Sequence, residues 1–222
     1  YINEKAKMFL HFAATAYDDV SGGFLEDNTK MLSRAEKALV EEKDVLKSQR
    51  RKMTLCLRRV APETAIEKST WFHLENTMAM SMTYNLRRVN EVCKEHVDNN
   101  FRPLPKVFHD NLAAIRRNIT AVLLDSEAAV EESRPEVIDG LRRRCEDIKN
   151  DLTARSREVY DFLRKDNDAD MTVAYVYLNL LQESQELVTS LRKLLRASGK
   201  LNLAPSSYRS FTHPDSPEAK AS

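Results

Sequence analysis

The fold is divided at the stretch Glu95-His96-Val97-Asp98-Asn99-Asn100-Phe101-Arg102-Pro103-Leu104-Pro105. A long amphipathic run leads into it, and a histidine and an Asp-Asn-Asn sequence precede two prolines. Asparagine tolerates the left-handed backbone geometry that a helix exit often needs. Proline suits the first turn of a helix, where its missing N–H has no intrahelical partner to lose. The stretch therefore predicts that one helix ends near residue 98 and that the next begins at Pro105.

Apolar residues recur with helical period on both sides of this turn, and no segment shows the sustained alternation of a strand. Glycines and prolines separate the periodic segments. The expected helices span residues 1–20, 24–60, 66–98, 105–132, 135–165 and 170–198. Short connections between long helices favour antiparallel neighbours. The sequence predicts an all-α fold of six long antiparallel helices, arranged as one elongated bundle or as two three-helix bundles that share a core.

The segment 24–60 carries an apolar residue every seven positions: Leu25, Leu32, Leu39, Leu46, Met53 and Val60. Its partner positions are less apolar, with Asn28, Ala35, Glu42, Gln49 and Cys56. A two-stranded coiled coil needs apolar residues at both positions. This pattern favours a long helix packed inside the bundle, with dimerisation through the heptad face as the alternative.

The composition narrows the class of function. Lys and Arg number 35 against 34 Asp and Glu, so the net charge of +1 gives no reason to expect a nucleic-acid partner. No stretch approaches the roughly 20 apolar residues of a membrane-spanning helix. Three scattered cysteines fit neither a disulfide framework nor a zinc site, which favours a reducing, cytoplasmic setting. The sequence contains no phosphate-binding glycine loop and no nucleophile motif, so we do not expect an enzyme.

Two further patterns have simple structural interpretations. The run Asp166-Asn167-Asp168-Ala169-Asp170 resembles the start of a calcium loop, but positions six and twelve hold Met171 and Tyr177, so a helix-capping turn fits better. Basic runs such as Arg142-Arg143-Arg144 have acidic neighbours and favour a solvated, ion-paired surface. Attraction to anionic lipid headgroups is the functional alternative for these runs.

The last helix of each half contains a similar segment. Residues 86–91, Leu-Arg-Arg-Val-Asn-Glu, align with residues 178–183, Leu-Asn-Leu-Leu-Gln-Glu. The alignment favours two three-helix bundles related by an internal repeat, although helical periodicity alone could produce the same match.

Segments around this repeat resemble the C-terminal domain of bacterial sodium/phosphate cotransporter family proteins. The resemblance rests on residues 84–104 and 177–195, and it covers about 66–110 and 170–198. Its most specific element is Glu95, His96, Val97, Asp98, Asn99 and Asn100. In that family the domain is similar to the phosphate regulator PhoU, which implies two three-helix bundles over residues 1–199, with halves of about 1–100 and 101–199. The Ser- and Pro-rich residues 200–222 are expected to form a disordered tail.

The resemblance also implies where a metal site would lie. PhoU-like proteins carry a Glu-x-x-x-Asp pattern in each repeat, and acids four residues apart share one helical face. By position, the first repeat has Arg87 and Glu91, and the second has Asn179 and Glu183. Each pair lacks its first acid. Glu91 and Glu183 remain candidate ligands, but one carboxylate in each repeat makes a poor metal site, and we expect no cofactor.

The resemblance implies a cytoplasmic regulatory or interaction domain of a sodium-dependent phosphate transporter. The domain would follow a membrane transport domain of the same chain, which would handle sodium and phosphate at the bacterial inner membrane. The chain begins at Tyr1, without methionine and inside a helical pattern, which fits the C-terminal part of a longer protein. The alternatives are a stand-alone PhoU-like metal-binding protein of phosphate signalling and a structural helical adaptor, and an oligomer is possible.

Overall fold

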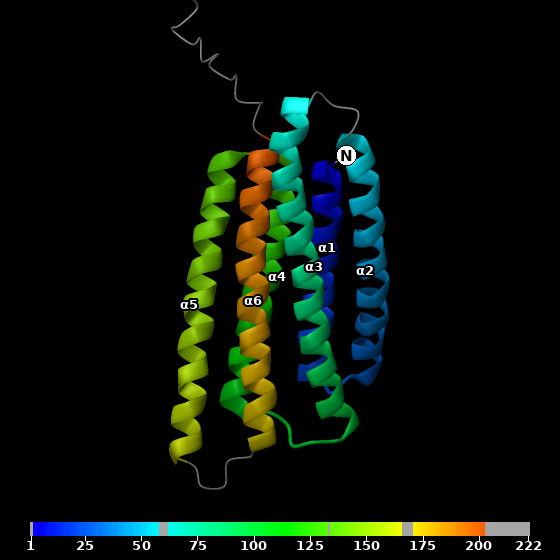
Figure 1. Cartoon of the computed structure of the whole chain (residues 1–222). Helices are drawn as coiled ribbons and strands as arrows, with labels where there is room; N and C mark the ends of the chain where they lie inside the picture. Colours follow the sequence, from blue (N-terminus) through cyan, green and yellow to red (C-terminus); the bar gives the residue numbers. More distant parts are fainter. Residues whose placement is uncertain (1, 58–61, 133, 166–170, 203–222) are drawn as a thin grey trace, which may run out of the picture.

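The computed structural model describes residues 2–57, 62–132, 134–165 and 171–202. This part of the chain consists of six α-helices and contains no strand (Figure 1). The helices are α1 (Ile2–Leu25), α2 (Thr29–Leu57), α3 (Pro62–Asp98), α4 (Lys106–Glu132), α5 (Pro135–Lys165) and α6 (Met171–Asn202). The predicted all-α fold is confirmed. The predicted capping turn at residues 166–170, the tail from residue 203 and the heptad residue Val60 lie outside the described residues.

The helices form two three-helix bundles, α1–α3 and α4–α6, which pack side by side. Two antiparallel helix pairs join the bundles, since α1 packs against α4 and α3 packs against α6. Helices α2 and α5 lie at opposite outer edges of the molecule (Figure 1). This arrangement confirms the prediction of two three-helix bundles. None of the described helices is long and apolar enough to cross a membrane.

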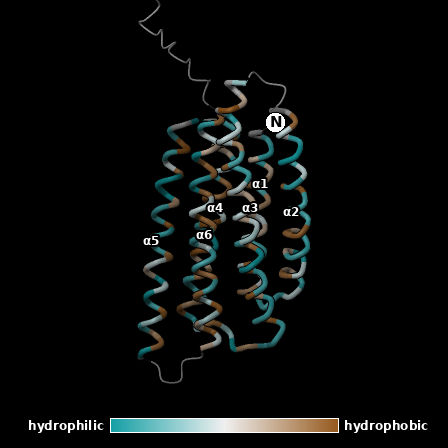
Figure 2. Tube along the Cα trace, in the orientation of Figure 1, coloured by the Kyte–Doolittle hydropathy of each residue, from teal (hydrophilic) through white to brown (hydrophobic). Residues whose placement is uncertain are grey.

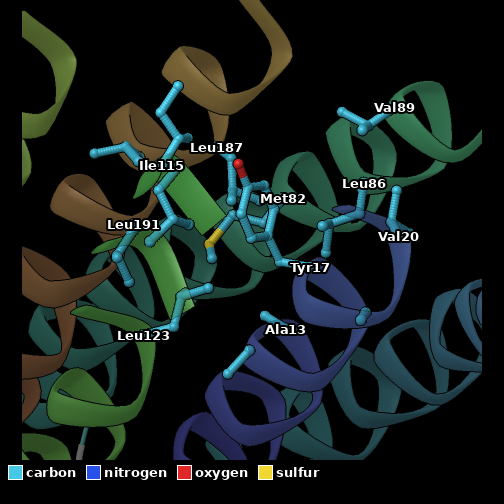
Figure 3. Close-up of a cluster of buried hydrophobic side chains, with 14 of the residues drawn as sticks. Ala13, Tyr17, Val20, Met82, Leu86, Val89, Ile115, Leu123, Leu187 and Leu191 are labelled. Atoms are coloured by element: carbon cyan, nitrogen blue, oxygen red, sulfur yellow. The ribbon is translucent and has the colours of Figure 1, made fainter. Parts of the chain in front are cut away.

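Hydrophobic and hydrophilic residues alternate along each helix, as helical amphipathicity requires (Figure 2). On α2 the heptad residues Leu32, Leu39 and Leu46 are buried in the core, each at 2% exposure or less. At the centre, side chains of both bundles meet in one cluster (Figure 3), including Tyr17 of α1 and Leu187 of α6. The hydrophobic core is therefore shared across the two halves rather than confined to each.

The first helix ends five residues later than predicted, because the two glycines do not break it. Gly22 and Gly23 lie inside α1, which continues to Leu25. A Cβ atom at Gly22 would lie 2.7 Å from the guanidinium group of Arg116, and one at Gly23 would lie 3.1 Å from Leu32. The glycines thus allow close approach of α4 and α2 rather than a turn.

The turn between α1 and α2 uses polar residues instead. Asp27 adopts a left-handed conformation with φ of 49°. The amide of Asn28 donates to the carbonyl of Gly23, and that of Asp27 donates to Phe24, a pairing typical of a Schellman helix end. Asn28 then caps the next helix, since its side-chain oxygen accepts from the amide of Met31. Helix α2 accordingly begins at Thr29 rather than at residue 24.

The last helix was also predicted to end too early. Helix α6 continues through Ser198 and Gly199 to Asn202, so the first three residues of the predicted tail are helical. Leu201 is buried beside Phe72 of α3, which holds this last turn against the bundle. At the other end of α3, the helix begins at Pro62 rather than at residue 66.

Candidate functional site

The stretch from Glu95 to Pro105 closes α3 and leads into α4. Helix α3 ends at Asp98, and Asn100 adopts a left-handed φ of 51°. The amide of Phe101 donates to the carbonyl of His96, and that of Asn100 donates to Val97. These two hydrogen bonds form a Schellman motif, the same ending that α1 has. The left-handed geometry predicted for the Asn residues therefore occurs at Asn100.

His96 ties this turn to the end of α1. Its side chain is buried, and its Nε2 atom lies 2.9 Å from the carbonyl oxygen of Arg102, to which it donates. The rings of Phe24 and Phe101 meet the imidazole edge-on, at centroid distances of 5.3 and 5.5 Å. These contacts show a histidine that holds the loop in place.

Glu183 lies at the contact between α3 and α6 and is only 3% exposed. Its Oε1 atom lies 2.8 Å from a guanidinium nitrogen of Arg88, and its Oε2 atom accepts a hydrogen bond of 2.8 Å from the side-chain amide of Asn85. Both oxygens of the carboxylate are therefore bound by side chains of α3. The guanidinium of Arg88 also lies over the ring of Tyr84, 5.9 Å from its centroid.

The other candidate ligand lies in a different environment. The side chain of Glu91 is 58% exposed and makes a loose ion pair of 3.5 Å with Arg87, one turn earlier on α3. Asn179 donates its side-chain amide to the carbonyl of Tyr175 on its own helix. Neither of the predicted pairs thus brings two carboxylates together.

These residues do not suit the metal that a PhoU-like pattern implies. The positive charge that a metal ion would provide comes from Arg87 beside Glu91 and from Arg88 beside Glu183. Within the described ranges, no three His, Cys, Asp or Glu side chains are placed to hold one ion. The donor set therefore forms one ion pair within α3, Arg87 with Glu91, and one between α3 and α6, Arg88 with Glu183.

Glu183 belongs to a row of polar contacts that joins α3 to α6. We call this row the polar seam, and it comprises Glu75, Ser81, Asn85 and Arg88 on α3 and Glu183, Ser190 and Ser198 on α6. The hydroxyl of Ser190 donates to Ser81 over 3.1 Å, and that of Ser198 donates to the carboxyl group of Glu75. Because each member sits on one half and its partner on the other, the polar seam fixes how the two halves align.

The most unusual member of the polar seam is Glu75, which is 7% exposed. Burial raises the pKa of its carboxyl group to about 7, against the opposing effect of the hydrogen bond from Ser198. The small cavity beside it, with a volume of about 30 Å³, is lined by Lys5 of α1 and Gln49 of α2 among others. Burial also raises the pKa of Glu42 on α2 to about 7, opposed by the nearby charge of Lys5.

Sequence reasoning singled out Glu183 and missed its partners Asn85 and Arg88. It also missed Glu75, although a signal was present. Glu75 lies three residues after Phe72 and four before Ala79, both of which are buried, so helical period places it on the inward face. A charged residue on an inward face is rare enough to mark a paired or functional group.

Comparison with known proteins identifies the fold. No family model matches the sequence, and no curated protein matches it. Among solved structures, the crystal structure of PhoU from Pseudomonas aeruginosa is similar with a TM-score of 0.73 and 7% sequence identity, over 90% of this chain and 94% of that one. The phosphate transport system regulatory protein PhoU from Streptococcus pneumoniae gives 0.61 and 11%, over 90% and 92%. The chain has the PhoU fold.

The likeness covers nearly the full length of both PhoU chains, so it describes the whole arrangement of two bundles rather than a shared helical hairpin. It places the polar seam between the third helices of the two halves of the PhoU fold. At these identities the likeness concerns the fold, and the side chains of the seam are this chain's own.

Proposed function

We propose that this chain is a regulatory domain of a phosphate transport system. The observation that carries the proposal is the PhoU fold, which covers nine tenths of the chain. One of the two similar structures is described as a phosphate transport system regulatory protein.

We further propose that the domain serves a sodium-dependent phosphate transporter. Its partner would be a membrane transport domain that precedes it in the same chain, and it would lie on the cytoplasmic side of the bacterial inner membrane. The support for this context is the resemblance of the element from Glu95 to Asn100 and of the last helix to sodium/phosphate cotransporter proteins.

The mechanism would be a conformational bias. A partner can shift an equilibrium only by binding two states with different affinity, and each tenfold difference is worth about 1.4 kcal/mol. Every pair of the polar seam joins α3 of one half to α6 of the other. A movement of one half relative to the other would therefore break or retain these pairs as a group. A transporter whose shape favours one alignment of the halves would therefore be coupled to this seam.

The test compares sodium-driven phosphate uptake by the transporter with and without this domain, at matched membrane levels. Loss of the domain should change the rate, the affinity or the response to external phosphate. Equal uptake in all three respects would refute the regulatory role.

A pair of variants then tests the seam. Glu183→Gln removes the charge that Arg88 holds between the halves, whereas Glu91→Gln removes an exposed charge on α3. We expect the Glu183 variant to alter regulated uptake and the Glu91 variant to leave it unchanged. Equal behaviour of the two variants would show that the seam does not transmit the bias.

A further inference from the structure

A pocket of about 200 Å³ opens between the first turns of α5 and the last turns of α6. Its lining consists of Ile138, Asp139, Arg142, Leu195, Arg196, Gly199 and Lys200. The volume far exceeds the roughly 30 Å³ share of one water molecule but is smaller than the 300–1,000 Å³ of a typical drug-sized site. The pocket therefore suits a small ligand.

The charge of the lining is strongly positive for a protein whose net charge is only +1. Arg142, Arg196 and Lys200 face a single carboxylate, that of Asp139, which leaves a net charge of +2 around the pocket. Like charges that share a small volume repel one another, and a bound anion relieves that repulsion. An anion with a charge near −2 would neutralise the lining.

Arg142, Arg196 and Lys200 each have N–H donors or a positive charge that could bind such an anion. One guanidinium nitrogen of Arg142 donates to Asp139 over 2.8 Å, while its Nε atom is buried and lacks an acceptor in the described part of the chain. The guanidinium of Arg196 lies 5.8 Å from the centroid of the Trp71 ring, which orients it without neutralising it. Among the described residues, no carboxylate pairs with Arg196 or Lys200.

The remaining lining residues set the shape of the pocket. Ile138 and Leu195 are buried and give it an apolar floor. Gly199 leaves one wall of the pocket without a side chain. A Cβ atom at this position would lie 3.6 Å from Ile138, which is an ordinary van der Waals contact. The glycine is therefore not required by packing, and its effect is to leave the pocket open.

We propose that this pocket binds a phosphate group. Phosphate and its monoesters carry about −1.5 to −2 charges near neutral pH and offer several acceptor oxygens, which match two guanidinium groups and one ammonium group. The lining of the pocket shares no residue with the polar seam, and the proposal stands whether or not the domain regulates a transporter. The phosphate group could belong to free inorganic phosphate or to a phospholipid headgroup.

The experiment measures binding to the purified chain in two arms at fixed ionic strength. The first arm titrates inorganic phosphate by calorimetry, with chloride as the reference anion. The second arm sediments the protein with vesicles of phosphatidylcholine alone or with added phosphatidic acid. Saturable binding in the first arm identifies free phosphate as the ligand, and binding only to the anionic vesicles identifies a lipid phosphate.

Matched variants separate the pocket from general surface charge. Arg196→Gln with Lys200→Gln removes two pocket cations, whereas Arg143→Gln with Lys193→Gln removes two exposed cations of the same two helices outside the lining. We expect the pocket pair to weaken binding at least about tenfold and the outside pair to change it less than about twofold. Equal weakening by both pairs, or no binding in either arm, would overturn the proposal.

A second variant fills the pocket without changing its charge. Gly199→Met should place a side chain in the pocket and abolish binding, while Gly140→Met on α5, where no atom lies within 4 Å of the added Cβ, should retain it. Circular dichroism checks that both proteins fold. If the folded Gly199 variant binds as well as the original chain, the ligand does not occupy this pocket and the proposal fails.

Discussion

Glu75→Gln tests how a carboxyl group buried between α3 and α6 couples the stability of the fold to pH. The glutamate has an ordinary pKa of 4.5, and burial raises it to about 7 in the folded chain. Below about pH 4.5 the group is protonated in both the folded and unfolded states. Between about pH 4.5 and 7 the folded chain keeps the proton while the unfolded chain releases it, so stability falls as pH rises.

The magnitude follows from the same two values. The pKa of Glu75 rises from 4.5 to about 7, and each pKa unit corresponds to about 1.4 kcal/mol. The buried carboxyl group therefore lowers the free energy of unfolding by roughly 3 kcal/mol, and this loss is complete above about pH 7. Glutamine is neutral at every pH and still offers an oxygen to the hydroxyl of Ser198. The variant should therefore be more stable than the original chain by roughly 3 kcal/mol near pH 8, and about equally stable near pH 4.5.

The assay is urea unfolding followed by circular dichroism at both pH values. Glu42, whose pKa burial also raises to about 7, contributes in the same direction, but it is present in both proteins and cancels in the comparison. Glu91→Gln, at an exposed position on the same helix, serves as the control for the loss of a carboxyl group outside the core. A Glu75 variant whose advantage is the same at both pH values would refute the reasoning.

Four further substitutions probe the helix contacts and helix ends. Glu183→Ala leaves the Arg88 guanidinium without its acceptor and should lower the free energy of unfolding by about 2 kcal/mol, less than for a fully buried pair because Arg88 is half exposed. Gly140→Ala should raise it by roughly 0.5–1 kcal/mol, and Gly22→Ala should raise it less, because only the methyl group at residue 22 has to displace the Arg116 guanidinium. Asn100→Gly should change it by less than about 0.5 kcal/mol, because glycine adopts the same left-handed φ without strain.

Chemical or thermal unfolding measures the effect of all four. A Glu183 variant as stable as the original would mean that the buried ion pair contributes nothing beyond its desolvation cost. Equal gains for Gly22→Ala and Gly140→Ala would show that the Arg116 guanidinium moves aside without a cost. A marked loss of stability in Asn100→Gly would show that the asparagine side chain, rather than its backbone geometry, closes α3.

The sequence predicted well those helix ends that depend on local chemistry. Pro105 and Pro135 marked the starts of α4 and α5 to within one residue, because proline acts on its own turn of backbone. Asn100 likewise occupies the left-handed position at the end of α3. Each of these signals is contained in a few neighbouring residues, so no knowledge of the tertiary structure was needed.

Glycines misled the prediction for the opposite reason. The helices predicted to end at residues 20 and 198 were each stopped just before a glycine, yet Gly22 and Gly199 both lie within helices. At Gly22 the missing side chain makes room for Arg116, which is 94 positions away in the chain. Local sequence cannot distinguish a glycine that ends a helix from one that allows close packing of another helix. The distinction depends on which distant residue packs against the glycine.

The candidate site was likewise predicted only in part from the sequence. Resemblance to a family pattern singled out Glu183, but its neutralisation by Arg88 and Asn85 follows from the register between α3 and α6. Helical period alone places a residue on a face of its own helix. It does not tell which residues of another helix that face will meet, so ion pairs across the seam could not be predicted from the sequence.

The polar seam has a consequence for a chain that is cut. Cleavage in the loop between α3 and α4 would leave two three-helix fragments, each with one side of the shared core uncovered. On reassembly, a slip by one helical turn would move Glu183 away from Asn85, so a carboxylate that is 3% exposed would lose a hydrogen bond that it accepts in the native alignment. The fragments should therefore recombine in a single alignment, as the unlike subunits of a heterodimer do.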